Sequence, residues 1–211
     1  MKKIIGIISK RFPGGNDFKK GRIIEDSIIN YFKRENTELI SIICDEKNLI
    51  DEKILNFCDG FVFQGGSYEI SDFHKQIFDF GIKNKKPIIG ICLGMQFMGF
   101  YSLDKILEEK IQNISDVNHN DKLLELVHKV KSKKESHINR IFGDEFIVNS
   151  KHNDCLIEIG NEFEISAYSD DNIIEAIEHK NKELFVIGVQ FHPETMQNVE
   201  NLVTEFIKFM L

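Results

Sequence analysis

Residues Pro87–Phe97 read Pro-Ile-Ile-Gly-Ile-Cys-Leu-Gly-Met-Gln-Phe and carry the strongest structural signal in this chain. Its apolar first half predicts a buried strand, and the strand breaks at a cysteine between two glycines. A Gly-x-Cys-x-Gly turn places a nucleophile on a strained corner between a strand and a helix, because glycines leave room where a Cβ would clash. The next N–H and the helix N-terminus then face the reacting carbonyl. The pattern therefore predicts a thiolate enzyme with Cys92 as nucleophile.

A second chemical group ends another apolar run about one hundred residues later. The run Val186–Phe191 is followed directly by His192, Pro193 and Glu194. A cysteine nucleophile is activated by a histidine within hydrogen-bond reach, and a carboxylate or amide usually holds that histidine. Cys92, His192 and Glu194 are therefore predicted to be nucleophile, base and orienting group.

Each of these residues also has a structural interpretation. A free cysteine after an apolar strand most often packs as a small hydrophobe, and a His-Pro pair at a strand end most often forms a turn. A lone glutamate is most simply a solvated carboxylate. The combination favours the catalytic interpretation, because two strand ends carry complementary groups and glycines flank only the cysteine.

Three segments together resemble the class I glutamine amidotransferase superfamily. They are Gly90–Gln96, Gln190–Glu194 and a strand with a glycine loop at Asp59–Gly66. The resemblance implies an oxyanion hole in which Gly65 or Gly66 supplies one backbone N–H and Leu93 supplies the other. One such donor typically contributes about 3 kcal/mol to catalysis. Without the cysteine turn, the two glycines would be interpreted as an ordinary tight turn.

Within that superfamily, the chain is similar to γ-glutamyl hydrolases of the peptidase C26 branch, which act on amides such as γ-glutamyl-γ-aminobutyrate. This resemblance rests on Val148–Asn153 and on Asp171–Glu178. The family commonly carries a second histidine or a glutamine where this chain has Asn153 and Asp154. Its usual glycine loop is altered here to Gly65–Ser71, so the shape of the substrate is expected to differ.

Five further residues are candidate substrate contacts. The resemblance implies that Gln96, one turn after the cysteine, binds the glutamyl end of the substrate and that His152 and Ser150 line the site. Arg11 and Arg22 lie in the first β–α connection and suit an anionic substrate or leaving group. The alternatives are a structural polar group for Gln96, a surface turn for His152 and solvated cations for the two arginines.

Short apolar runs alternate with helical periodicity, which predicts an α/β fold with a mostly parallel sheet covered on both faces. The resemblance implies an open, flavodoxin-like sheet, with a small antiparallel extension at one edge. Residues 1–211 are interpreted as a single domain, whose ligand lies beyond the carboxyl ends of the strands. The expected parallel strands are Ile4–Ser9, Leu39–Ile43, Asp59–Phe63, Ile88–Ile91 and Val186–Phe191. Helices are expected near 26–32, 73–82, 95–101 and 199–210, and short antiparallel strands at 111–113, 128–130, 146–148 and 164–167.

Charge and hydropathy exclude several classes of partner. The net charge of −7 argues against a nucleic-acid surface, and the short lysine run at 129–134 is interpreted as a solvated strand edge or loop. The first apolar run is shorter than a signal-peptide core, and no stretch approaches the roughly 20 apolar residues that span a bilayer. We therefore expect no nucleic-acid or membrane partner and a cytoplasmic location.

The cysteines point the same way. Four are present, without a Cys-x-x-Cys pair or zinc-like spacing with the seven histidines. A reduced cytoplasm suits them, and neither a metal nor an organic cofactor is expected to be required. The four are Cys44, Cys58, Cys92 and Cys155.

The leading interpretation is a cysteine-dependent hydrolase of the γ-glutamyl amide bond, which releases glutamate and an amine or amidate from a small-molecule substrate. A nucleotide-linked γ-glutamyl amidate, as in capsule biosynthesis, is a variant of this interpretation. The first alternative is a glutaminase subunit that supplies ammonia to a separate synthetase. An alternative of another class is a non-catalytic binding protein that retains the fold.

Overall fold

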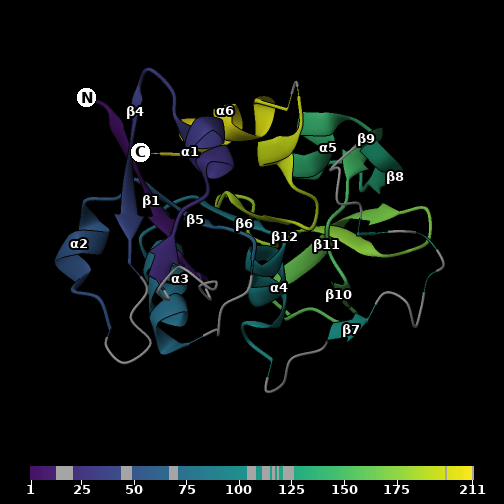
Figure 1. Cartoon of the computed structure of the whole chain (residues 1–211), viewed down its shortest axis with the longest axis horizontal. Helices are drawn as coiled ribbons and strands as arrows, with labels where there is room; N and C mark the ends of the chain where they lie inside the picture. Colours follow the sequence, from purple (N-terminus) through teal and green to yellow (C-terminus); the bar gives the residue numbers. More distant parts are fainter. Residues whose placement is uncertain are drawn as a thin grey trace.

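The computed structural model describes residues 1–12, 21–43, 49–66, 71–103, 108–110, 115, 117, 119–120, 126–197 and 199–210. Its centre is a nine-stranded sheet with the order β4-β1-β5-β6-β13-β12-β11-β8-β9 (Figure 1). The first five strands in this order run parallel: β4 (Thr37–Ile42), β1 (Lys3–Ile8), β5 (Gly60–Phe63), β6 (Ile88–Ile91) and β13 (Val186–Val189). The other four continue the sheet antiparallel: β12 (Ile174–His179), β11 (Phe163–Ser169), β8 (Leu126–Ser132) and β9 (Glu145–Asn149).

The remaining elements are short pairs and helices. Two small antiparallel pairs are formed by β2 (Lys10–Phe12) with β3 (Gly21–Ile23) and by β7 (Glu108–Lys110) with β10 (Asp154–Leu156). The helices are α1 (Asp26–Phe32), α2 (Glu52–Asn56), α3 (Asp72–Lys83), α4 (Leu93–Phe100), α5 (His137–Phe142) and α6 (Asn201–Lys208), with a 3-10 turn, η2, at Pro193–Thr195. No helix in the described ranges combines the length and hydropathy that a bilayer crossing requires.

The predicted α/β class is confirmed, with one difference of proportion. The antiparallel part contributes four of the nine strands, because β12 pairs directly with β13 and hairpins then extend the sheet outward. The expected short strands at 128–130, 146–148 and 164–167 fall within β8, β9 and β11. The one expected at 111–113 lies outside the described residues. The lysines of β8 and Lys133 after it are exposed and form surface ion pairs, as the solvated interpretation predicts. The pairs are Lys129–Glu145, Lys131–Asp170 and Lys133–Glu164.

Helices cover both faces of the sheet (Figure 1), and the strands alternate side chains between two cores. On β5, Val62 joins the core under α1, α5 and α6, while Phe61 and Phe63 join the core under α2, α3 and α4. The same division separates Ile89 from Ile88 on β6. This is the period-two alternation of a strand buried on both faces.

Three parallel neighbours place their carboxyl ends at one edge of the sheet. In register, Phe63 of β5 lies beside Gly90 of β6, and Ile91 of β6 lies beside Val189 of β13. Since parallel strands end on the same side, the segments after them converge although they are far apart in sequence. The predicted placement of Gly65, Cys92 and His192 beyond these strand ends is therefore met by the topology.

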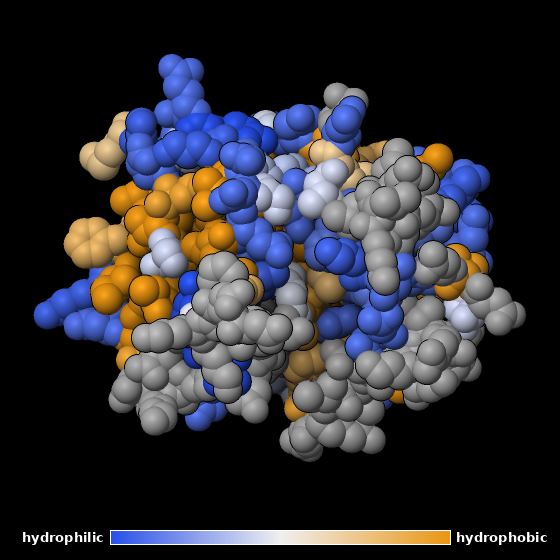
Figure 2. Space-filling model, viewed as in Figure 1, coloured by the Kyte–Doolittle hydropathy of each residue, from blue (hydrophilic) through white to orange (hydrophobic). Residues whose placement is uncertain are grey.

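Apolar side chains gather on part of the surface. Figure 2 shows hydrophobic residues exposed on the side of the molecule where Figure 1 places α2 and β4. An open hollow of about 410 Å³ lies there, and none of the predicted site residues lines it. The exposed large hydrophobic residues of this region are Ile43, Leu49, Ile54 and Phe57.

Helix α4 packs against the sheet at a distance that only glycine permits. A Cβ added to Gly94 would lie 2.2 Å from the carbonyl oxygen of Phe63, which is backbone and cannot move aside cheaply. A Cβ added to Gly90 would lie 2.5 Å from Met98 Sδ. Both glycines around the cysteine are therefore required by close approach.

The variant Gly94→Ala tests this packing. We expect it to lower the free energy of unfolding by about 3 kcal/mol, the upper part of the range for overpacked interiors, because the clash is with backbone. Urea unfolding followed by circular dichroism measures the change. Gly21→Ala is the control, since nothing lies within 4 Å of its added Cβ. Equal stability of Gly94→Ala and the parent would contradict the packing.

Candidate active site

Cys92 occupies a strained corner between β6 and α4. Its φ of 51° and ψ of −109° lie in a region that side-chain-bearing residues rarely adopt. Its N–H donates to Val189 O (2.8 Å), and its carbonyl accepts from the Gln96 N–H (3.0 Å). Backbone strain of this kind costs about 1–3 kcal/mol and persists where the surroundings fix it. The thiol is thus held at a half-buried position at the head of α4, where the sequence places the nucleophile.

His192 and Glu194 form a tight pair at the end of β13. His192 Nδ1 and Glu194 Oε1 are 2.7 Å apart, and the glutamate side chain is 2% exposed. A carboxylate only accepts, so Nδ1 carries a proton and Nε2 is the ring atom left for other chemistry. Nε2 is buried and has no partner at ordinary hydrogen-bond geometry. The pair therefore leaves Nε2 of His192 without a hydrogen-bond partner of ordinary geometry.

Asn149 clamps the backbone of this histidine. It is fully buried at the end of β9; its Oδ1 accepts the His192 N–H (2.8 Å), and its Nδ2 donates to His192 O (2.9 Å) and to Thr195 Oγ1 (2.7 Å). From the sequence, Asn149 was only part of the Val148–Asn153 segment that resembles the C26 branch, and its contact with His192 was not predicted. A polar residue directly after the apolar run of β9 was the available signal.

The glycine loop after β5 lies against both predicted catalytic groups. A Cβ added to Gly65 would lie 3.0 Å from His192 Cε1 and 3.2 Å from Cys92 Cβ. Gly66 has a φ of +131°, and an added Cβ there would meet Lys10 Cδ at 2.5 Å. Leu93 is the first residue of α4, where a backbone N–H has no acceptor within its own helix. The altered loop residues 67–70 lie outside the described residues.

Three of the predicted substrate contacts lie on the side of α4 and the antiparallel strands. Gln96 is buried, and its Nε2 donates to Asp154 O and Gln190 Oε1, both at 3.1 Å. Ser150 and His152 are also buried, and their contacts are with His119, Asp154 and Glu175. The surface-turn alternative for His152 is therefore wrong. The substrate roles of these three residues stay predictions.

The two arginines face each other across a small hairpin. Arg11 of β2 and Arg22 of β3 are register partners, next to Lys10, which pairs with Glu25 Oε1 at 2.6 Å. Lys10 is a cation that sequence reasoning did not single out, although it lies beside Gly66. The hairpin thus places positive charge near the glycine loop, and the anion-binding role of the arginines stays a prediction.

Comparison with known proteins identifies the family of this chain. The family model described as "Peptidase C26" matches residues 71–194, which is more than half of the chain. The glutamine-hydrolyzing GMP synthase subunit of Picrophilus torridus is 30% identical over 166 residues, covering 77% of this chain and 81% of that protein. The chain belongs to the class I glutamine amidotransferase superfamily.

Two further relatives define the limits of this similarity. The glutamine-hydrolyzing GMP synthase of Francisella tularensis is 29% identical over 70% of this chain, but the match spans only 27% of that larger protein. The crystal structure of a protein assigned as a GMP synthase subunit from Thermoplasma acidophilum superposes with a TM-score of 0.71 at 21% identity, covering 100% of this chain and 94% of that one. The structural likeness confirms the fold. Membership of this family indicates that the chain is an enzyme of the amide-hydrolase type.

The surroundings of His192 change its pKa from the ordinary value of a histidine. Burial disfavours its charged form, but hydrogen bonding to Cys92 and Glu194, together with their negative charges, outweighs burial and raises the pKa of His192 to about 10. The contact with Cys92 falls outside ordinary hydrogen-bond geometry, since Nε2 has no partner at that geometry. The raised pKa favours an imidazolium beside the sulfur. By contrast, burial raises the pKa of the Cys58 thiol to about 11, so that thiol stays protonated at neutral pH.

The variant Glu194→Gln tests the role of the carboxylate in this charge. Because the folded pKa of about 10 lies above the ordinary value of 6.5, charged His192 stabilises the fold fully below pH 6.5, and this contribution is lost as pH rises through 10. Removing the carboxylate is expected to lower the His192 pKa and to shrink that pH-dependent contribution. Histidine ¹⁵N NMR titration measures the pKa directly, with His179 as internal reference. A His192 pKa that is unchanged in the variant would contradict the assignment.

Proposed function

We propose that this protein hydrolyses a γ-glutamyl amide bond through a covalent intermediate on Cys92. The observation that carries the proposal is the convergence at one sheet edge of a strained cysteine, a histidine anchored to a buried carboxylate 2.7 Å away, and the Gly65 backbone beside both. A nucleophile, a base and a group that orients the base are the parts that acyl transfer needs. The predicted roles of Cys92, His192 and Glu194 are therefore kept.

In the first step, the Cys92 thiolate attacks the γ-carboxamide carbon of the substrate. The carbonyl oxygen becomes an oxyanion, for which the N–H groups of Leu93 and of Gly65 or Gly66 are the proposed donors. His192, as the imidazolium, gives its Nε2 proton to the departing nitrogen when the C–N bond breaks. The products of this step are an amine or amidate and a γ-glutamyl thioester on Cys92.

In the second step, water hydrolyses the thioester. His192, now neutral, accepts a proton from the water as its oxygen attacks the same carbon, and the C–S bond breaks to release glutamate and regenerate the thiolate–imidazolium pair. Glu194 and Asn149 hold the ring throughout, one through Nδ1 and the other through the backbone of His192. The protein thus finishes in the state in which it began.

The C26 match supports a substituted γ-glutamyl amide as the substrate, with glutamate as one product. The altered loop after Gly66 favours a leaving group different from that of the usual family members. A nucleotide-linked γ-glutamyl amidate is the variant that the basic hairpin of Arg11 and Arg22 would suit, because its phosphates are anionic.

A glutaminase subunit is the second candidate function. It is supported by the similarity to the Picrophilus protein, which is a glutamine-hydrolyzing subunit of GMP synthase. The match covers 81% of that subunit. In this case the substrate is glutamine, the product nitrogen is ammonia, and a separate synthetase consumes it. The chemistry at Cys92 is the same in both candidates, so the leaving group separates them.

Cys92→Ala is expected to lower glutamate release by at least about 10⁴-fold while leaving the fold intact, because the residue that forms the covalent intermediate is lost. The measurement is glutamate release by the purified protein from glutamine and from a panel of amine-linked and nucleotide-linked γ-glutamyl amides. Cys58→Ala is the matched control, since that cysteine is buried in the core and its thiol is protonated at neutral pH.

The panel also decides between the candidates. Fast Cys92-dependent cleavage of a substituted amide over glutamine supports the stand-alone hydrolase. Weak release from glutamine alone supports the glutaminase subunit, and added synthetase should then increase it. Undiminished release by Cys92→Ala would contradict both, and no release from any substrate would favour the non-catalytic binding protein.

A further inference from the structure

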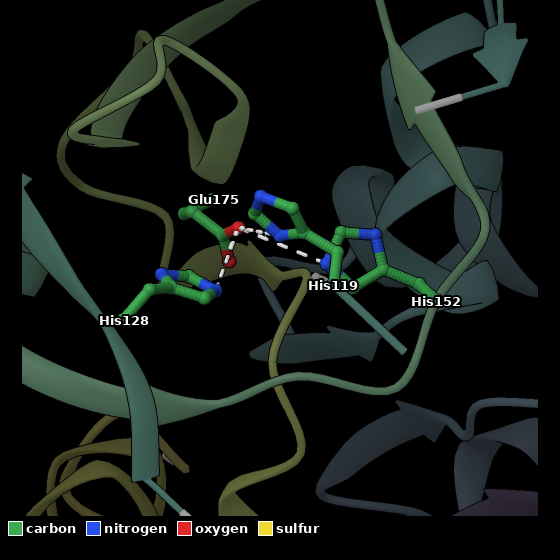
Figure 3. A group of neighbouring side chains, drawn as sticks. All are labelled: His119, His128, His152 and Glu175. Atoms are coloured by element: carbon green, nitrogen blue, oxygen red, sulfur yellow. Dashed lines mark ion pairs between the residues drawn. The ribbon is translucent and has the colours of Figure 1, made fainter. Parts of the chain in front are cut away.

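A group of three histidines and one glutamate lies among the antiparallel strands. His128 is on β8, Glu175 is on β12, and His119 and His152 come from segments joined by a backbone hydrogen bond from the His152 N–H to His119 O (2.8 Å). Figure 3 shows the three rings surrounding the carboxylate. One ligand-type atom of each residue lies within 4.8 Å of all the others, and at most 7% of any of the four side chains is exposed.

The distances around the carboxylate are those of a coordination shell. Glu175 Oε1 lies 3.6 Å from His119 Nδ1, 3.5 Å from His128 Nε2 and 3.7 Å from His152 Nε2. Adjacent ligand atoms of a tetrahedral zinc site are separated by about 3.3 Å, given metal–ligand bonds of about 2.0–2.1 Å. None of these three contacts is a hydrogen bond. Both Glu175 oxygens and the inward nitrogens of His128 and His152 are buried without a hydrogen-bond partner.

The outer contacts of two histidines orient their lone pairs inward. His152 Nδ1 lies 3.0 Å from Asp154 O, a carbonyl that only accepts, so the proton is on Nδ1 and the inward Nε2 carries a lone pair. His119 Nε2 lies 3.0 Å from Asp171 Oδ2, which likewise places the proton outside. Ser150 Oγ lies 2.9 Å from His119 O and 3.3 Å from His119 Nδ1, so its one proton can go to the nearer carbonyl and leave the Nδ1 lone pair for an ion.

The inward atoms of His128, His152 and Glu175 face one another and lack hydrogen bonds that would balance their lone pairs and negative charge. The Asp171 carboxylate accepts hydrogen bonds from Ser115, Ser169 and His119, and its contact with His119 fixes the tautomer of that ring. Neutral rings would point lone pairs at a buried carboxylate, and a cation between them removes that repulsion.

We propose that His119, His128, His152 and Glu175 bind one Zn²⁺ ion. Imidazole and carboxylate ligands suit this ion, and histidine ligands of zinc usually donate their outer N–H to a carboxylate or a backbone carbonyl, as His119 and His152 do here. Four protein ligands close the shell, which assigns the ion a structural role. The spacing of the histidines along the chain gave no indication of this group.

The site adjoins the candidate active site through one carbonyl. Asp154 O accepts from both His152 Nδ1 (3.0 Å) and Gln96 Nε2 (3.1 Å), and the Gln190 N–H donates to Glu175 O (2.8 Å). Zinc would therefore fix the segment that holds Gln96 on α4 and the strand end that leads to His192. The ion takes no part in the proposed reaction, and its binding is measured independently of activity.

Metal content and cobalt substitution test the proposal. We expect one zinc per chain by inductively coupled plasma mass spectrometry of protein expressed with Zn²⁺, and a lower unfolding temperature after chelation. Co²⁺ added to the metal-free protein should give the visible absorption of a tetrahedral site. Glu175→Gln is expected to weaken Co²⁺ binding by at least about 100-fold, and Asp171→Asn by about 10–100-fold through loss of the outer carboxylate.

His137→Gln is the matched control, a buried histidine of α5 that contacts Phe185 and Phe209 and should leave metal binding unchanged. Folded parent protein that contains no zinc and gives no tetrahedral Co²⁺ spectrum would overturn the proposal without any variant. Stoichiometric binding that Glu175→Gln and Asp171→Asn leave intact would also overturn it, since the ion would then lie elsewhere.

Discussion

The contact between Gly94 and the carbonyl of Phe63 is the constraint on which the candidate active site depends. It brings the first turn of α4 directly onto the end of β5, so the chain must turn sharply between β6 and α4. Cys92 absorbs that turn with a positive φ. A wider approach would relax the corner and move the thiol away from the Gly65 loop. The proposed nucleophile is thus positioned by close backbone packing that a side chain at residue 94 would disrupt.

The antiparallel half of the sheet supports the chemistry of the parallel half. Asn149 comes from β9, at the opposite edge of the sheet from β4, yet its amide holds the backbone of His192 at the end of β13. Gln96 is likewise anchored by the carbonyl of Asp154 in β10, which pairs with β7 beside the main sheet. The parallel strands supply the cysteine, the histidine and the glycine loop, and the extension supplies the groups that keep them in place. The proposed zinc site lies in this extension, where it would tie its segments together.

The sequence predicted well those features that depend on neighbouring residues. The strand–cysteine–helix turn is local, and so is the His192–Glu194 pair, whose two members are separated by one proline. The parallel order placed Gly65 beside them, because strands β5, β6 and β13 end at one edge. Hydrophobic periodicity also located each of the expected parallel strands and flanking helices.

The features that sequence reasoning missed depend on long-range pairing. The Asn149 clamp and the approach of His119, His128 and His152 to Glu175 require β8, β9, β11 and β12 to pair in register. No spacing along the chain encodes that register. For the same reason, His152 and Ser150 could be assigned to a resembling segment, but the neighbours that they contact could not be predicted.

Amide cleavage is proposed to proceed through a thioester on Cys92. This claim is tested by mass spectrometry of the intact protein, quenched in acid during turnover of a γ-glutamyl substrate. We expect a mass increase equal to one glutamyl group, located by digestion on the peptide that contains Cys92 and absent from Cys92→Ala. Rapid turnover with no adduct on the parent protein, or an adduct on another residue, would contradict the claim.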